Sequence, residues 1–322
     1  MRKVRWGVLG TADIARGETI PGMRLAEHCE LDAIAGRDPD KARAFQEAFG
    51  FRKAYGSYEE LLSDPEVEAV YIPLPNHLHC QWAVRALRAK KHVLCEKPLA
   101  VSEAEAEEMF RAAEENGVLL MEAFAYLHSP FVDAVKAELD AGAVGDIRYM
   151  ASAFITGRRP DTDIRLRRET RGGALYDLGC YTVSMALRML GKEPAHVRAA
   201  SQFSEKHIDL FTQAMLVYDD GAVADLSCGM LTGLGRLDRF VIRGTAGEII
   251  SPVEFNQCGQ IPYTVTRGGR SETKTVAVPN NYMLEAEQLS RCVLFGKAPK
   301  VTKEFSLMTA RVTDRILSTV GY

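Results

Sequence analysis

The first 122 residues alternate short apolar runs with helical patterns, and this rhythm restricts the fold more than any other feature of the chain. The apolar runs predict strands at residues 4–9, 31–35, 67–73, 91–95 and 118–121. The stretches between them predict helices at residues 13–25, 39–49, 77–89 and 102–116. Strands that alternate with helices in this way form βαβ units around a parallel sheet. Because the strands carry few polar residues, we expect helices on both faces. Residues 1–122 are therefore predicted to form a doubly wound α/β domain.

The rhythm changes from residue 123 onwards, where strand-like runs become longer. These runs lie at residues 146–155, 196–203, 208–218, 222–230 and 239–243, and helical patterns lie at 131–141, 172–190, 282–295 and 305–320. Asp219-Asp220-Gly221 stands between two of the runs and is typical of a hairpin. The polar stretch 261–275 is expected to be a loop or an edge. Residues 123–322 are thus predicted to form an α+β domain with a mostly antiparallel open sheet.

Composition excludes several classes of protein. The 322 residues include 40 Lys and Arg against 43 Asp and Glu, a net charge of −3, which argues against a broad basic face for nucleic acid. The sequence contains no run of about 18 apolar residues, so it predicts no membrane-spanning helix. The N-terminus shows no secretory signal, and the seven scattered cysteines contain no C-x-x-C pair. The dispersed histidines predict no metal site. We expect a cytoplasmic protein without a nucleic-acid or membrane partner.

A glycine-containing turn follows the first predicted strand and opens the first predicted helix. Gly10, Ala12 and Ala15 fit the spacing G-x-G-x-x-G/A, with alanine in place of the middle glycine. Such a turn brings backbone N–H groups at a helix N-terminus close to a pyrophosphate. A plain tight turn between strand and helix is the alternative. The residues expected to contact a dinucleotide here are Gly10, Thr11, Ala12, Asp13 and Ile14.

The end of the second predicted strand bears on the choice of nucleotide. An acidic residue at such a strand tip would hold a ribose 2′-hydroxyl and favour NAD. Arg37 could instead pair with a 2′-phosphate through its planar guanidinium, which favours NADP. In the alternative interpretation Arg37 is a solvated loop residue and Asp38 caps the next helix.

Two further predicted strands end at the same carboxyl edge of the sheet, where ligands bind in open α/β folds. One is followed by Asn76 and His77, which could simply begin a helix, and the other by Lys97 and Pro98. A surface lysine is the ordinary alternative for Lys97. The candidate cofactor-binding residues at these two ends are Pro73, Leu74, Asn76, His79, Glu96 and Lys97.

A third group lies in the second half of the chain. Asp177 and Tyr181 are four residues apart and share one helix face. A tyrosine can act as an acid or base when a nearby cation lowers its pKa, although an ordinary hydrogen-bonded pair would show the same spacing. Tyr126 and Phe154 could wall an apolar side of a pocket or pack in the core. The charged residues before the helix could bind substrate hydroxyls or form a solvated loop; they are Arg158, Arg159, Asp161 and Arg165.

These motifs together resemble the Gfo/Idh/MocA family of nicotinamide-dependent oxidoreductases over essentially the whole chain. The resemblance rests on residues 7–15, 71–77, 95–98, 121–124 and 172–181. It is nearest to the branch that contains glucose-fructose oxidoreductase, dimeric dihydrodiol dehydrogenase and NADP-dependent xylose dehydrogenase, which carries tyrosine at the position of Tyr181. Ala12 and Gly36 depart from the family pattern, since glycine and serine are common there.

The resemblance implies an N-terminal Rossmann domain and roles for individual residues. Lys97 would contact both the nicotinamide ribose and the substrate hydroxyl, and Pro98 would follow a cis peptide bond. Tyr181 would be the acid/base, with Asp177 as a positioning or catalytic partner. The cofactor would be NADP or, less preferred, NAD. The second-domain sheet would join copies of the chain into a dimer or tetramer.

The function predicted on this basis is hydride transfer between a nicotinamide and a carbinol carbon of a sugar, polyol or cyclic diol. We expect Lys97, Tyr126, Phe154, Arg158, Asp177 and Tyr181 to contact the substrate. Two alternatives remain open: a non-catalytic NAD(P)-binding sensor, and an NAD-dependent glycoside hydrolase. The catalytic groups argue against the sensor, because it has no need for a proton relay.

Overall fold

A computed structural model describes residues 2–233, 235–251 and 255–322. The chain packs as two compact units, one of Met1–His128 with Pro279–Leu307 and one of Ser129–Val278 with Met308–Tyr322. The first unit thus includes a late helix, α8 (Asn281–Phe295), that lies far from residue 122. Trp6 in β1 (Val4–Leu9) shows why, since its indole N–H donates to Ser290 Oγ of α8 at 3.0 Å. The sequence pattern predicts this helix but not the sheet against which it packs. The division into a cofactor half and a substrate half stays a prediction.

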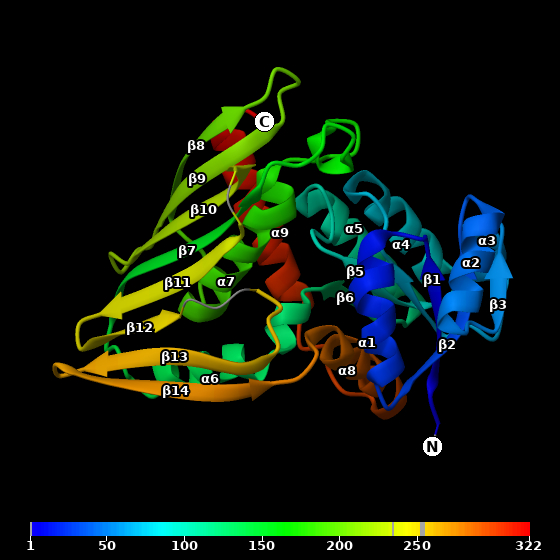
Figure 1. Ribbon diagram of the computed structural model, residues 1–322, viewed down its shortest axis with the longest axis horizontal. Coiled ribbons are helices and arrows are strands. Elements are labelled where there is room, and N and C mark those ends of the chain that lie inside the picture. Colours follow the sequence, from blue (N-terminus) through cyan, green and yellow to red (C-terminus); the bar gives the residue numbers. More distant parts are fainter. Residues whose placement is uncertain (1, 234, 252–254) are drawn as a thin grey trace. The chain divides into compact units, whose positions relative to one another are not determined.

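The first unit is built on a parallel sheet (Figure 1). Among its described residues, six strands follow the order β3-β2-β1-β4-β5-β6. The other five are β2 (Cys29–Ala35), β3 (Lys53–Tyr55), β4 (Ala69–Ile72), β5 (His92–Glu96) and β6 (Leu120–Ala123). The strand order reverses between β1 and β4, and ligands bind at such reversals, beyond the carboxyl ends of the strands. The predicted doubly wound fold is confirmed; the short strand β3 was not predicted.

Helices connect the strands of this sheet. They are η1 (Ala15–Thr19), α1 (Ile20–Leu25), α2 (Pro39–Phe49), α3 (Tyr58–Ser63), η2 (Asn76–Leu78), α4 (His79–Arg88), α5 (Glu103–Asn116) and η3 (Ala125–His128). Their ends follow ordinary capping chemistry. The side chain of Ser102 accepts a hydrogen bond from the backbone N–H of Glu105 at the start of α5, a contact worth about 1 kcal/mol. Gly117 ends the same helix with a positive φ of 67°.

The second unit is built on a mixed, mostly antiparallel sheet (Figure 1). Its described strands follow the order β14-β13-β12-β11-β7-β10-β9-β8, and β7 and β10 form a parallel pair. They are β7 (Ile147–Gly157), β8 (His196–Phe203), β9 (Asp209–Val217), β10 (Val223–Thr232), β11 (Leu237–Gly244), β12 (Gly247–Ser251), β13 (Gly259–Arg267) and β14 (Arg270–Val278). The predicted hairpin is confirmed at Gly221, whose φ is 81°. The polar stretch 261–275, expected to be a loop or an edge, forms most of β13 and β14. The strand β14 is at the edge of the sheet, whereas β13 lies between β12 and β14.

The helical segments of this unit are α6 (Pro130–Asp140), η4 (Ile164–Leu166), η5 (Leu175–Gly179), α7 (Cys180–Leu190) and the later part of α9 (Lys303–Val320). The helix α7 packs against β7 and β10, while η5 leads into it without a break. Figure 1 shows α6 and α7 on the same side of the sheet. Within the described ranges, none of the helices has the length and apolar character that crossing a bilayer requires.

Candidate active site

The turn after β1 has the geometry of a phosphate-binding turn. Gly10 has a φ of +125°, and its N–H donates to the carbonyl oxygen of Ala35 at 2.8 Å. A Cβ at this position would lie 3.1 Å from Cδ2 of Leu74 and would require a backbone conformation that L-residues rarely adopt. The helical segment begins directly afterwards, so the first N–H groups of the helix have no partner within it. These features fit a dinucleotide pyrophosphate.

The tip of β2 presents a cation rather than a free carboxylate. Asp38 Oδ1 accepts hydrogen bonds from the N–H groups of Asp40 at 3.0 Å and Lys41 at 3.2 Å, so the helix cap of the alternative interpretation is confirmed. Arg37 is exposed and interacts with the hydroxyl of Tyr58. Burial raises the pKa of Tyr58, and the guanidinium of Arg37 opposes that increase. Arg37 is therefore the charged group available to a nucleotide at this strand end.

The ends of β4 and β5 are joined by the imidazole of His79. Its Nε2 lies 2.7 Å from the carbonyl oxygen of Leu74, and its Nδ1 lies 2.8 Å from that of Pro98. Full burial lowers the pKa of His79. The ring thus lies between two turns at the carboxyl edge of the sheet, and a neutral imidazole, which has one N–H, can donate to one of the two carbonyl oxygens. The predicted contact of His79 with a cofactor stays a prediction. Pro73 is buried and Asn76 is half-buried beside this link.

The β5 end carries the Glu96-Lys97-Pro98 motif. The Lys97–Pro98 peptide bond is cis, as the family resemblance implies. Glu96 is buried, and its carboxylate accepts the hydroxyl of Tyr71 at 2.5 Å. Lys97 is half-buried. Glu122 accepts the N–H of Leu99 at 2.9 Å, and burial raises the pKa of Glu122 to about 7. Several buried polar groups therefore hold the segment that carries Lys97.

In the second unit, Asp177 and Tyr181 lie on consecutive turns of η5 and α7, and both are buried. The Asp177 carboxylate lies 2.8 Å from Nε of Arg165 and 3.5 Å from a terminal nitrogen of Arg159. Asp177 also raises the pKa of Arg165, so the guanidinium keeps its charge. The sequence allowed two interpretations of Arg159 and Arg165, a solvated loop or contacts with substrate hydroxyls. In the structure both arginines pair with the candidate catalytic carboxylate of Asp177.

Tyr181 belongs to an aromatic cluster. Its ring centroid lies 5.2 Å from those of both Phe154 and Phe255, and Phe154 and Phe255 stack on each other with an interplanar angle of 16°. The guanidinium of Arg236 lies 4.4 Å from the ring centroid of Phe154. Phe154 was predicted as a candidate wall of the pocket. Phe255 and Arg236 were not predicted, because they lie in loops and no local sequence pattern indicates that they approach Phe154.

The other predicted substrate residues lie elsewhere in their units. Arg158 is 76% exposed and pairs with Asp161 at 3.2 Å. Tyr126 is 2% exposed and packs edge-on against Phe124 in the first unit, the arrangement expected of a core residue. Neither contact requires a substrate, and the substrate roles of Arg158 and Tyr126 remain predictions.

Asp209 supports the start of the helix that bears Asp177 and Tyr181, and the sequence did not single it out. This buried residue begins β9, and its Oδ2 accepts the N–H of Leu175 at 2.7 Å and the hydroxyl of Thr212 at 2.8 Å. Burial raises the pKa of Asp209 to about 6. Gly173, with a φ of +114°, gives Asp209 room, since a Cβ there would lie 1.9 Å from Oδ1 of Asp209. The Gly172-Gly173 pair is the sequence feature that could have indicated a close approach of another side chain to the backbone at this point.

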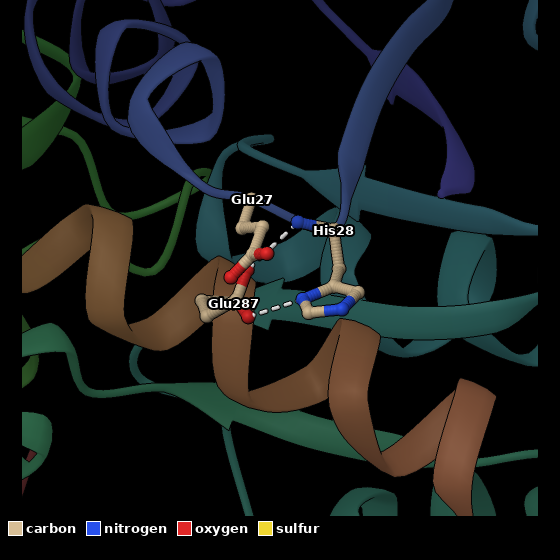
Figure 2. Close-up of side chains that lie close together, drawn as sticks. All are labelled: Glu27, His28 and Glu287. Carbon is tan, nitrogen blue, oxygen red and sulfur yellow. Dashed lines mark hydrogen bonds and ion pairs between the residues drawn. The ribbon is translucent and has the colours of Figure 1, made fainter. Parts of the chain in front are cut away.

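Candidate metal ligands gather away from these residues. Glu27, His28 and Glu287 bring ligand atoms within 4.8 Å of one another (Figure 2). His28 Nδ1 already lies 2.6 Å from Glu287, which also accepts the N–H of His28, so a hydrogen-bonded pair explains the arrangement. His28 directly precedes β2, at the amino edge of the parallel sheet and opposite the phosphate turn. In a second set, Asp32, Asp64 and Glu66 form ion pairs with Arg52 and Lys53.

Family models match both parts of the chain. Residues 4–124 match "Oxidoreductase family, NAD-binding Rossmann fold", and residues 132–250 match "GFO/IDH/MocA C-terminal domain". The chain belongs to the Gfo/Idh/MocA oxidoreductase family. The family, the enzyme class and the fold class predicted from the sequence are therefore confirmed.

Similar family members are named dehydrogenases and reductases. The D-xylose 1-dehydrogenase (NADP(+)) 2 of Haloferax volcanii is 37% identical, over 97% of this chain and 95% of its own. The trans-1,2-dihydrobenzene-1,2-diol dehydrogenase of Xenopus laevis is 31% identical, over 98% of each. The crystal structure of KijD10, a 3-ketoreductase from Actinomadura kijaniata with NADP and TDP-benzene, matches with a TM-score of 0.92 and 34% identity, over 99% of this chain and 98% of its own.

Proposed function

We propose that this protein is an NADP-dependent oxidoreductase that moves hydride between the nicotinamide and a carbinol carbon of a sugar, polyol or cyclic diol. The observation that carries the proposal is the carboxyl edge of the parallel sheet. There an anion-binding turn at Gly10 and the half-buried Lys97 lie at the ends of strands on either side of the topological reversal. Related proteins named for NADP, for a sugar or for a diol support the same reaction class.

The residues present fit an NADP molecule. The backbone of Gly10, Thr11, Ala12, Asp13 and Ile14 would approach the pyrophosphate closely, because Gly10 has no side chain and a helix begins directly after the turn. The N–H of Gly10 is engaged by Ala35, so the donors would be the first N–H groups of the helix. Arg37 would pair with the 2′-phosphate, since Asp38 is engaged as a helix cap. Pro73, Leu74, Asn76, His79 and Glu96 would complete the site at the next strand ends. When bound, the nicotinamide supplies the hydride donor or acceptor, and NAD is the second-choice cofactor.

Tyr181 is proposed to hold and move the proton of the reacting hydroxyl. The cation of Lys97 would favour the phenolate of Tyr181 and the developing alkoxide of the substrate. Asp177, held by Arg165 and Arg159, would orient the substrate or the tyrosine. Acid–base help of this kind contributes roughly 10²–10⁴-fold, and the orientation of substrate must supply the remainder.

The aromatic cluster supports a ring-shaped substrate. Phe154 and Phe255 give Tyr181 an apolar neighbourhood that suits the C–H face of a pyranose or a cyclic diol. Tyr126 and Arg158 are proposed as outer contacts. We also propose a cytoplasmic homo-oligomer, a dimer or tetramer, that associates through the sheet of the second unit.

Nicotinamide absorbance at 340 nm (a general property of the reduced cofactor), followed across a panel of aldoses, polyols and cyclic diols, tests this proposal. On the best substrate, Tyr181→Phe and Lys97→Met are expected to lower kcat at least about 100-fold, while the Kd for NADPH changes little. Tyr149→Phe is the matched control, because Tyr149 in β7 of the same unit hydrogen-bonds to Asp225. Near-normal turnover by Tyr181→Phe would overturn the assigned role. Tight NADPH binding without turnover on any substrate would favour a sensor.

A further inference from the structure

A fully buried tyrosine lies behind the Lys97 segment. Tyr71 is in β4, between β1 and β5 in the sheet. Its hydroxyl accepts a hydrogen bond from Thr19 Oγ1 at 2.9 Å and donates one to Glu96 Oε1 at 2.5 Å. Thr19 is also fully buried, at the end of the helical turn η1 that follows the phosphate turn. A continuous series of hydrogen bonds therefore links the helical turn η1 to the end of β5.

This series of hydrogen bonds ends on the backbone of Lys97. The second carboxylate oxygen of Glu96 accepts the N–H of Lys97 at 3.3 Å. Glu122 fixes the next part of the segment through the N–H of Leu99, and Nδ1 of His79 lies 2.8 Å from the carbonyl oxygen of Pro98. Buried polar groups thus hold the backbone on both sides of Lys97. The direction in which the Lys97 side chain extends from the backbone therefore depends on the positions of these groups.

Several ionisable side chains surround Glu96, the carboxylate to which Tyr71 donates. Glu285 of α8 and Glu122 of β6 face the same interior, together with Lys97 and with His79 of α4. Glu285 is fully buried, and neither of its carboxylate oxygens has a hydrogen-bond partner within the described ranges. Burial raises the pKa of Glu285 well above its usual range. Glu96 differs from Glu285 in that its carboxylate receives two donors, the Tyr71 hydroxyl and the Lys97 N–H.

We propose that Tyr71, supported by Thr19, is a positioning residue that orients the carboxylate of Glu96 and thereby the backbone segment from which Lys97 reaches the reacting hydroxyl. Tyr71 itself touches neither substrate nor cofactor in this role. The inference rests on the proposed function of Lys97.

The test is Tyr71→Phe, which removes the hydroxyl and keeps the ring. We expect kcat to fall roughly 10- to 100-fold, because small misplacements of a catalytic group have effects of this size. The Kd for NADPH should change by a smaller factor than kcat, since the phosphate turn at Gly10 is untouched. The KM for the substrate should change by a smaller factor than kcat, because Tyr71 and Glu96 would position Lys97 without contacting the substrate. Tyr55→Phe is the matched control: it removes a tyrosine–carboxylate bond of 2.9 Å, to Asp64, from the same unit.

A second readout does not depend on turnover. Hydrogen exchange of the peptide covering residues 96–99 should be faster in Tyr71→Phe than in the parent protein or in Tyr55→Phe. Faster exchange with unchanged kcat would refute the positioning role and leave a structural one. Unchanged exchange would also refute it. If no substrate is turned over by the parent protein, the proposed function fails, whereas the exchange result still reports on the hydrogen bonds from Thr19 to Lys97.

Two further variants test whether the effects of Tyr71→Phe arise from the hydrogen bonds of its hydroxyl. Thr19→Val removes only the hydroxyl that donates to Tyr71, so it should change exchange and rate in the same direction by a smaller factor. It also serves where Tyr71→Phe does not fold. Glu285→Gln should leave kcat and the exchange of residues 96–99 close to those of the parent protein, because neither carboxylate oxygen of Glu285 has a hydrogen-bond partner within the described ranges. A lower kcat or faster exchange in Glu285→Gln but not in Tyr71→Phe would overturn the proposal.

Discussion

Asp209 offers a quantitative test of how the second unit holds its helix. The substitution is Asp209→Asn, which keeps the shape and an acceptor oxygen but cannot ionise. In the structure, the carboxylate is buried against the start of the segment that carries Asp177 and Tyr181, where it accepts the N–H of Leu175 at 2.7 Å. Burial raises its pKa from an ordinary 3.8 to about 6 despite this hydrogen bond.

The magnitude follows from the difference between folded and unfolded pKa values. One pKa unit corresponds to about 1.36 kcal/mol, so ionising Asp209 in the folded protein costs roughly 3 kcal/mol more than in the unfolded chain. Between pH 4 and pH 6 the folded state binds more protons at this site, so the free energy of unfolding falls as pH rises. The favourable contribution is complete below about pH 4 and is lost above about pH 6. Asp209→Asn lacks this dependence, so the parent protein should lose about 3 kcal/mol relative to the variant between pH 4 and pH 7.

The assay must observe the second unit. Both tryptophans of the chain, Trp6 and Trp82, lie in the first unit, so tryptophan fluorescence does not serve. Hydrogen exchange of peptides within residues 174–190, measured at several pH values and corrected for intrinsic exchange, reports on the segment that Asp209 supports. Asp219→Asn, at an exposed position in the same unit, is the control and should show no such change. Parallel stability curves for the parent protein and Asp209→Asn from pH 4 to pH 7 would refute the reasoning.

Three other substitutions test separate parts of the structure. Arg37→Ala should lower the preference for NADP over NAD by roughly 10- to 100-fold in the ratio of kcat/KM, since a hydrogen bond to a charged group contributes about 1.5–3 kcal/mol; an unchanged ratio would contradict the assignment. Gly10→Ala should weaken NADPH binding about tenfold or more in a fluorescence titration, because alanine at a φ of +125° is strained and its Cβ would lie 3.1 Å from Leu74. Gly173→Ala should destabilise the second unit by about 3 kcal/mol or more, since its Cβ would overlap Asp209; wild-type exchange protection of residues 174–190 would contradict this.

The sequence predicted the elements whose periodicity is strong. The boundaries of β1, α2 and β8 were predicted to the residue, because apolar spacing and capping residues mark them clearly. The three-residue strand β3 and the helix α3 were not predicted, because so few residues show no clear period. The strand β12 was also missed. Its register depends on pairing with β11 and β13 rather than on its own sequence.

The site was predictable where its residues belong to local motifs. The conformation of Gly10 follows from a turn between a strand and a helix, and the cap formed by Asp38 follows from its place before Pro39. The partners of Asp177 were not predictable, because Arg165 and Arg159 meet it through an irregular segment whose path the sequence does not define. Such long-range pairs depend on how segments cross in space, and that information is absent from residue spacing.

The proposed catalytic side chains in the two units have the same kind of support. Lys97 stands next to Glu96, whose buried carboxylate is oriented by Tyr71, and the helix of Tyr181 begins on the buried carboxylate of Asp209. A buried carboxylate destabilises a fold unless donors satisfy it, and both groups have such donors. Each accepts a backbone N–H within a few residues of the side chain that it would place. Amide substitutions at these carboxylates should therefore separate stability from turnover: Asp209→Asn should be relieved of an ionisation penalty at neutral pH, yet turn over more slowly if the helix start loses its alignment.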